Sequence, residues 1–237
     1  MNEILEKAII DILKVGAVEI RNIDAGEKPF LYASGNWGPG YVSIKGLVSQ
    51  KLLFRKLTQL LAIEIAKKFP RLDLVVGNVT GGMIPGWLLS EYLGTYLGKE
   101  IPFLYNRGMR KKGGQKELIT GLFPKISFHR SRVLVVEELV NFAETTCNSI
   151  NILRDLDFRA SYAACILFYS NPKAIEKLEK YDVEMIYLFT LPDLLDIAEE
   201  FQAFSVKAIS DYRNFLRDPL EWQKKRGLEP VKNGGTQ

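Results

Sequence analysis

Two glutamates after an apolar run are the strongest chemical signal in this chain. Residues 132–136 read Arg-Val-Leu-Val-Val, and Glu137 and Glu138 follow directly. Such a run is typical of a central strand buried on both faces, and ligands of open α/β sheets bind at the carboxyl ends of these strands. An acidic pair there can bind ribose hydroxyls or a hydrated divalent cation. We predict that the strand ends at the pair and that both carboxylates face a ligand.

The residues after the acidic pair, 141–145, are predicted to form a loop that opens a helix. The backbone amides and the dipole at a helix N-terminus favour an anion, so this loop can receive a phosphate. The alternative is an acidic pair that merely ends a strand in solvent. The order of strand, loop and helix favours a ligand site, and specifically a site for a phosphorylated sugar.

Two further loops follow predicted strands. Residues 77–82 read Gly-Asn-Val-Thr-Gly-Gly, and paired glycines let backbone amides approach an anion closely, which predicts a pyrophosphate loop. Residues 107–116 are basic and rich in glycine, which suits a flap that closes cations over phosphates and excludes water. The alternatives are a plain turn for the first loop and a solvated hairpin tip for the second.

Alternating strands and helices must position these loops. We expect a helix from Ser49, as its N-terminal cap, to Phe69, and then strands and helices in turn. The expected elements are strands 72–76, 101–106, 132–137, 160–169 and 183–190 and helices 83–97, 145–156 and 172–180. This alternation predicts an α/β fold with a central parallel sheet flanked by helices.

Two terminal additions flank the predicted core. Residues 1–48 should form a small hood, with an amphipathic helix at 3–15 and short strands at 30–35 and 41–45. Residues 49–200 form the catalytic core in this division. Residues 201–237 form a helical extension that covers a sheet edge and ends in a frayed tail.

Composition excludes several classes of function. The chain has 237 residues, 47% of them hydrophobic and 25% charged, which is typical of a globular protein. Its net charge of +4 is spread along the chain, so we expect no nucleic-acid binding. No segment is apolar for long enough to cross a membrane and no targeting signal stands out, so we expect a cytoplasmic protein.

The few cysteines and the single histidine restrict the chemistry further. Cys147 and Cys165 are the only cysteines, in apolar or helical surroundings, and we expect reduced packing residues. His129 is the sole histidine. One chain therefore cannot supply a multi-histidine metal site, and the sequence gives no sign of a Ser-His-Asp or Cys-His mechanism.

The order of these motifs resembles that of the type I phosphoribosyltransferases, and within them the orotate enzymes. The similarity extends from about Phe30 to about Asp196, which is most of the chain. It rests on residues 30–35, 41–45, 75–77, 80–82, 105–116, 118–121 and 132–138.

The resemblance implies transfer of ribose 5-phosphate from phosphoribosyl pyrophosphate to a pyrimidine base, in nucleotide biosynthesis, with Mg²⁺ as cofactor. Glu137 and Glu138 would hold the ribose hydroxyls and, through these or water, the metal. Arg107 and Lys111 would be the catalytic cations, on a flap shared across a homodimer. The other implied substrate-binding residues are Ser34, Gly35, Thr80, Gly81, Gly82, Lys112, Asn141, Ala143 and Thr145.

Several positions depart from the family's pattern. Ala143 stands where glycine is usual, and Glu144 puts an anion where a phosphate should bind. Gly113 takes the place of a flap histidine, Ala33 that of a lysine in bacterial members, and no arginine follows Tyr169 to meet the orotate carboxylate. Two hypotheses follow: a working phosphoribosyltransferase, or an inactive protein of the same fold that serves as a nucleotide-binding regulator or an oligomeric scaffold.

Overall fold

The computed structural model describes residues 3–32, 35–108, 118–123 and 128–231. The chain divides into two compact units. We call residues 47–191 the core unit, and residues 1–46 together with 192–237 the terminal unit. The prediction divided the chain at residues 48 and 200 and treated the two ends as separate parts.

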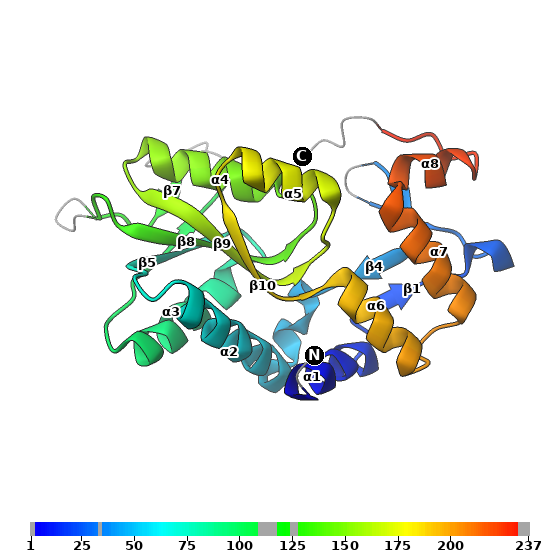
Figure 1. Cartoon of the computed structure of the whole chain (residues 1–237), viewed down its shortest axis with the longest axis horizontal. Helices are drawn as coiled ribbons and strands as arrows, with labels where there is room; N and C mark the ends of the chain where they lie inside the picture. Colours follow the sequence, from blue (N-terminus) through cyan, green and yellow to red (C-terminus); the bar gives the residue numbers. More distant parts are fainter. Residues whose placement is uncertain (1–2, 33–34, 109–117, 124–127, 232–237) are drawn as a thin grey trace. The chain divides into compact units, whose positions relative to one another are not determined.

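The core unit is an α/β sandwich of three layers. Its helices are α2 (Lys51–Lys68), α3 (Met83–Leu97), α4 (Glu144–Asp155) and α5 (Pro172–Lys180), and its strands are β5 (Leu74–Asn78), β6 (Phe103–Asn106), β7 (Ile119–Thr120), β8 (Arg132–Val140), β9 (Arg159–Phe168) and β10 (Glu184–Thr190). The strands form one sheet in the order β10-β9-β8-β5-β6-β7. All neighbouring pairs are parallel except β6 and β7. Helices α2 and α3 cover one face and α4 and α5 the other (Figure 1), which confirms the predicted parallel sheet flanked by helices.

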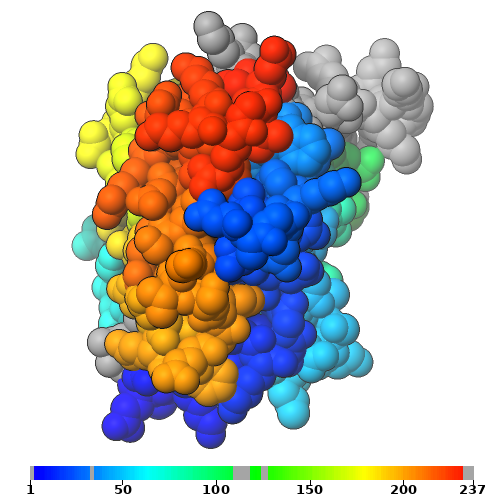
Figure 2. All heavy atoms as spheres, turned by 90° about the vertical axis from the view of Figure 1, so that its right-hand side faces the viewer, coloured from blue at the N-terminus to red at the C-terminus, as the bar shows by residue number. Residues whose placement is uncertain are grey.

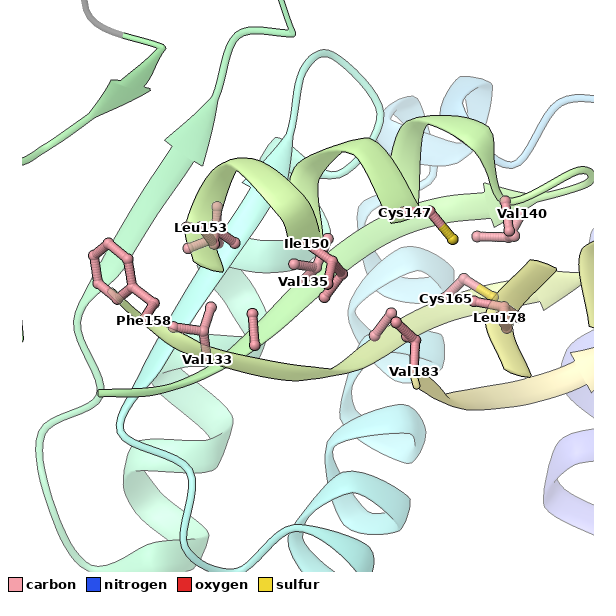
Figure 3. Packing of buried hydrophobic residues seen from close by; sticks show 14 of the residues in the cluster. Val133, Val135, Val140, Cys147, Ile150, Leu153, Phe158, Cys165, Leu178 and Val183 are labelled. Atoms are coloured by element: carbon pink, nitrogen blue, oxygen red, sulfur yellow. The ribbon is translucent and has the colours of Figure 1, made fainter. Parts of the chain in front are cut away.

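Strand β8 lies in the middle of the sheet, and the side chains of Val133 to Val136 are fully buried. Successive side chains of a strand point to opposite faces, so Val133 and Val135 share one face. They pack there against Ile150 and Leu153 of α4 (Figure 3). Burial of each such side chain stabilises the fold by roughly 1.5–3 kcal/mol. The apolar run therefore fixes β8 at the centre and holds α4 over it.

Both cysteines belong to this apolar cluster under α4. Cys147 and Cys165 are buried free thiols, and burial raises the pKa of each thiol. The expectation that they are packing residues is confirmed. Cys165 lies beside Glu137 on the neighbouring strand.

The terminal unit joins the two ends of the chain. Its elements are α1 (Glu3–Lys14), β1 (Val18–Ile20), the 3-10 turn η1 (Ile23–Ala25), β2 (Phe30–Leu31), β3 (Trp37–Gly38), β4 (Gly40–Val42), α6 (Leu191–Glu200, whose first residue lies in the core unit), α7 (Val206–Arg217) and α8 (Pro219–Lys224), and the 3-10 turn η2 (Lys45–Ser49) leads from this unit into the core unit. The Asn36 side chain forms two hydrogen bonds with the backbone of Val231, and the Trp37 amide donates to Gln223. Figure 2 shows the N-terminal atoms in blue beside the C-terminal atoms in orange and red.

Buried groups of the C-terminal helices hold this unit together. The carboxylate of Asp211 accepts hydrogen bonds from Trp222 at 2.8 Å and from Arg226 at 2.6 Å. The Tyr212 ring lies where a side chain on Gly40 would be, so β4 needs a glycine at that position. The C-terminal helices are thus part of a packed unit with the N-terminal strands.

Two predictions about element ends are wrong. Strand β8 does not end at the acidic pair but continues to Val140, because it remains paired with β9 as far as Phe168. Ser49 does not cap α2, since Gln50 precedes that helix and makes no capping bond from its side chain. The remaining predicted elements agree to within a few residues, while the short β1, β3, β7 and α8 were not predicted. Within the described residues, every helix falls short of the length and apolarity that a membrane crossing needs.

Candidate active site

The two glutamates of β8 face opposite sides of the sheet. Because the strand continues past them, the alternation of side chains separates Glu137 from Glu138. Glu137 points to the α4 side, where its carboxylate accepts a hydrogen bond from Thr145 at 2.9 Å. Glu138 lies on the other side, against Gly81: a side chain on Gly81 would collide with the Glu138 carboxylate. The pair therefore does not form a single acidic surface.

Glu137 is buried and has its own hydrogen-bond partners. Its side chain is 7% exposed, and Asn78 donates to the same Oε1 at 2.6 Å. Burial raises the pKa of Glu137 to about 7, and the neighbouring charge of Glu138 adds to this, while the bonds from Asn78 and Thr145 oppose it. Glu137 can thus hold a proton near neutral pH.

The glycine loop lies between β5 and α3. Gly82 has no room for a side chain, because a Cβ would lie 2.0 Å from the carbonyl oxygen of Val136. The Gly82 amide donates to Asn78 at 2.8 Å, which closes the turn. Thr80 is exposed, and the peptide that joins it to Val79 is cis. Gly81 thus lies beside Glu138, in the turn between β5 and α3.

The loop from Asn141 to Thr145 carries the chain from β8 into α4. Ala143 is buried and adopts the left-handed conformation, with φ of 57°, where glycine is usually found. The first backbone bond of the helix runs from Cys147 to Ala143. The preceding amides of the first turn have no acceptor within the helix, and they point with the positive end of its dipole toward the loop. Alanine thus adopts here a conformation that glycine adopts more readily.

Glu144, the unfavourable anion of this loop, is neutralised by a cation of the neighbouring helix. Lys177 of α5 lies 3.2 Å from the Glu144 carboxylate. Asn141 is also held from this side, through a 3.5 Å contact with the Asn171 side chain. The ion pair turns the charge of Glu144 toward α5.

The structure places the remaining predicted residues in three ways. Arg107 follows β6, where its guanidinium donates to Thr120 at 2.8 Å. Gly35 belongs to the terminal unit and has a positive φ of 81°. Residues 33–34 and 109–117, which include Ser34, Lys111, Lys112 and Gly113, and the tail from residue 232 lie outside the described residues.

Three polar residues of the site were not singled out from the sequence. Asn78, Asn106 and Ser149 are all at most 5% exposed and are hydrogen-bonded to one another. Asn78 and Asn106 are the last residues of β5 and β6. Their positions at the ends of two apolar strands were the signal in the sequence that could have identified Asn78 and Asn106.

The donors for a divalent cation are few. The described part of the chain contains no group of three His, Cys, Asp or Glu side chains that could hold a metal. Mg²⁺ is usually bound through one or two carboxylates, with waters and substrate phosphates completing its shell. The single carboxylate of Glu138 beside the glycine loop fits that mode and does not fit a cage made of protein ligands alone.

The chain is similar in sequence and in fold to known orotate phosphoribosyltransferases. No model of a protein family matches the chain. The orotate phosphoribosyltransferase of Ruegeria sp. strain TM1040 is 27% identical over 216 residues, which cover 90% of this chain and 89% of that protein. The crystal structure of orotate phosphoribosyltransferase from Aeropyrum pernix has a TM-score of 0.61 and 23% identity, over 84% of this chain and 99% of that one.

A complex of a more distant protein also shares the fold. Orotate phosphoribosyltransferase of Mycobacterium tuberculosis H37Rv with 5-phospho-α-D-ribosyl 1-diphosphate has a TM-score of 0.57 and 14% identity, over 82% of this chain and 93% of that one. The protein therefore has the fold of a type I phosphoribosyltransferase. Its sequence is similar to those of orotate phosphoribosyltransferases, as its sequence motifs had indicated.

Proposed function

We propose that the protein is a phosphoribosyltransferase that joins ribose 5-phosphate, taken from phosphoribosyl pyrophosphate, to a pyrimidine base, nominally orotate. Its orotate phosphoribosyltransferase relatives support this reaction. The observation that carries the proposal is the environment of Glu138. Its carboxylate lies against Gly81 of the glycine loop. Strand β8, which carries Glu138, leads directly into the phosphate loop before α4.

In this proposal, each part of the core unit binds one part of the sugar donor. Glu138 accepts hydrogen bonds from the ribose hydroxyls, and the amides of the first turn of α4 bind the 5-phosphate. The backbone at Thr80, Gly81 and Gly82 binds the pyrophosphate. Glu137 supports the phosphate loop through Thr145. The site thus orients the donor along the carboxyl ends of β5 and β8.

Positioning and electrostatics carry the catalysis we propose. The transition state is oxocarbenium-like, and negative charge develops on the departing pyrophosphate, so cations beside it lower the barrier. Arg107 and Lys111 are the proposed cations. Glu138 would hold Mg²⁺ through the ribose hydroxyls or water, and the metal would supply positive charge that offsets part of the pyrophosphate charge. Sharing of the basic flap across a homodimer, and a cytoplasmic location, are further parts of the proposal.

The alternative of an inactive relative is not favoured. Its main support in the sequence was the pair Ala143 and Glu144. Ala143 nevertheless adopts the left-handed conformation, and Glu144 is paired with Lys177. Both departures are therefore accommodated within the loop.

The test is a turnover assay on the full chain, with phosphoribosyl pyrophosphate, Mg²⁺ and orotate followed by ultraviolet absorbance. We expect loss of orotate absorbance and release of pyrophosphate with the wild type, and both at a much lower rate with the E138Q variant. Uracil in place of orotate tests the base, because Ser170 and Asn171, and no arginine, come directly after Tyr169. A folded wild type that binds phosphoribosyl pyrophosphate but turns over neither base would refute the enzymatic proposal.

A further inference from the structure

A continuous chain of buried hydrogen bonds crosses the sheet beneath the proposed phosphate sites. Asn106 donates to Ser149 at 2.6 Å, Ser149 donates to Asn78 at 2.5 Å, and Asn78 donates to Glu137 at 2.6 Å. The three strand residues come from adjacent strands: Asn106 lies opposite Asn78, and Asn78 lies beside Glu137 because Gly77 pairs with Val136. Ser149 reaches the chain from α4. We call these four residues the polar chain.

Every bond of the polar chain points the same way. The first donor is the backbone amide of Gly108, at the beginning of the basic segment, which donates to Asn106 Oδ1 at 3.0 Å. Asn106 donates to Ser149 and Ser149 donates to Asn78. Asn78 then donates to the carboxylate of Glu137. Hydrogen bonds aligned head to tail polarise one another. The polar chain is therefore a cooperative unit.

The two ends of the polar chain lie at two different loops of the site. At one end is Gly108, next to Arg107 in the basic segment. At the other end, Glu137 also accepts from Thr145 in the phosphate loop. Ser149 is bonded to Asn106 and Asn78 and to neither loop, so a change in Ser149 would break the connection between the two ends.

If these four positions served only to pack the core, apolar side chains would fill them at a lower cost in folding free energy. The members are between 1% and 7% exposed, and a buried polar group costs stability unless it is fully paired. Two residues before Asn78, Asn106 and Glu137, the same faces of their strands carry buried apolar residues. These are Val76, Leu104 and Val135. The polar residues replace this apolar pattern only at the level where the loops begin, which indicates a role in the site.

We infer that Asn78, Asn106 and Ser149 are positioning residues, which hold Arg107 and Gly108, where the basic segment begins, in place relative to the phosphate loop through Glu137. None of the three needs to touch substrate. This inference rests on the proposed function in one respect: it assigns phosphates to both loops. The mechanical link between the loops is independent of that assignment.

The first test uses amide hydrogen exchange and needs no turnover. The reporters are the amide of Gly108, which donates to Asn106, and the amide of Cys147, which closes the first turn of α4. We expect Ser149→Ala to speed exchange at both reporters by about tenfold, the effect of losing about one net hydrogen bond. Ser149→Thr, which keeps the hydroxyl, should restore much of the protection.

Ser90→Ala is the matched control. Ser90 is also buried in a helix of the core unit, but its hydroxyl only donates back to the carbonyl of Trp87. We expect it to leave exchange at Gly108 and Cys147 unchanged. If Ser149→Ala does not fold, Asn106→Ala tests the same link from its outer end and should speed exchange at Cys147 as well as Gly108.

The second test separates positioning from a purely structural role. We expect Ser149→Ala to raise KM for phosphoribosyl pyrophosphate by about tenfold with little change in kcat, because the loops bind the donor but the reacting atoms are untouched. Ser90→Ala should change neither. The inference is overturned if Ser149→Ala resembles Ser90→Ala in exchange and in KM. A wild type without turnover would sink the proposed function instead, and the exchange results would still decide the link.

Discussion

Glu137 and Glu138 are neighbours in the sequence, but their carboxylates lie on opposite faces of the sheet. One bonds to Thr145 beneath α4, and the other lies against Gly81 beside α3. The cause is that β8 continues to Val140, so the pleat of the strand separates adjacent side chains. An acidic pair at a strand end is therefore two separate sites here, and the two residues should respond differently to mutation.

The two conservative amide variants test this division of roles. We expect E138Q to fold normally and to lose at least about 100-fold in kcat/KM, since the carboxylate beside the glycine loop is removed. E137Q should lose about tenfold or less, because its amide oxygen still accepts from Asn78 and Thr145. Steady-state kinetics of both variants, with melting temperatures as a control, gives the comparison. Equal losses would contradict separate roles.

The raised pKa of Glu137 predicts a dependence of stability on pH. Burial raises this pKa from 4.5 to about 7, so between these values the folded protein holds a proton that the unfolded chain does not. The cost of burying the charge is complete above pH 7 and is removed as the pH falls toward 4.5. Relative to E137Q, the wild type should therefore gain stability over this interval, by about 3 kcal/mol at most.

Urea denaturation of both proteins at pH 5 and pH 8 measures this difference. Taking the wild type relative to E137Q cancels titrating groups that do not interact with Glu137. Glu138 and Cys165 do interact with it, so their titration contributes to the measured difference. A difference in the free energy of unfolding that is the same at both pH values would show that Glu137 is ionised throughout.

The left-handed Ala143 predicts a stabilising substitution. A left-handed conformation costs an alanine roughly 1 kcal/mol relative to glycine. Ala143 has a φ of 57°, so A143G should stabilise the protein, by about 0.5 kcal/mol once the lost methyl burial is counted. The control is A62G in the interior of α2, where the same change should destabilise by about 1 kcal/mol. Equal destabilisation by both would contradict the strain at Ala143.

Much of the fold could be predicted from the sequence because its core strands are strongly patterned. The continuous apolar run of β8 is typical of a strand buried on both faces, and the structure buries it in this way. The pairing of the two chain ends could not be predicted in this way. It depends on contacts such as that between Asn36 and Val231, which are 195 residues apart and leave no local pattern.

The site could be predicted only in part for a similar reason. Motifs located the glycine loop and the acidic pair, but the end of β8 is set by its pairing with β9 and not by its own residues. The partners of Glu137 come from β5 and α4, so they could be recognised only when these elements were placed beside one another. Ser149 carries no signal within its own helix.

The base of the sheet has an ion pair that should matter for acid stability. Asp73 accepts from the Arg132 guanidinium at 2.7 and 2.8 Å and from the Arg132 backbone amide at 3.0 Å. These bonds hold the pKa of Asp73 well below its ordinary value of 3.8. The ionised form therefore stabilises the fold above about pH 4, and this contribution is lost as the pH falls further.

D73N tests this contribution. We expect the variant to be less stable than the wild type at pH 7 by about 1–2 kcal/mol, with the difference shrinking as the pH falls below 4. The partly exposed Lys67–Glu64 pair on α2 supplies a control, because E64Q removes a surface ion pair that should contribute less than about 0.5 kcal/mol. A D73N variant as stable as E64Q would rule out the role of this pair in acid stability.

The ion pair between Glu144 and Lys177 should control binding of the 5-phosphate. Lys177 of α5 holds the Glu144 carboxylate at 3.2 Å, on the side of the loop toward α5. Without the lysine, the carboxylate is free to turn toward the proposed phosphate and repel it. K177M should therefore raise KM for phosphoribosyl pyrophosphate by about two- to fivefold, in proportion to the energy of a partly exposed pair.

The double variant separates repulsion from a general loss of charge. E144Q alone removes the anion, so it should leave KM unchanged or lower it, and K177M combined with E144Q should return KM to near the E144Q value. K173M on the same helix is the control, since the side chain of Lys173 makes no ion pair among the described residues. If K177M and K173M raise KM equally, or if E144Q fails to rescue K177M, the cation acts on the phosphate through general charge and not by holding Glu144.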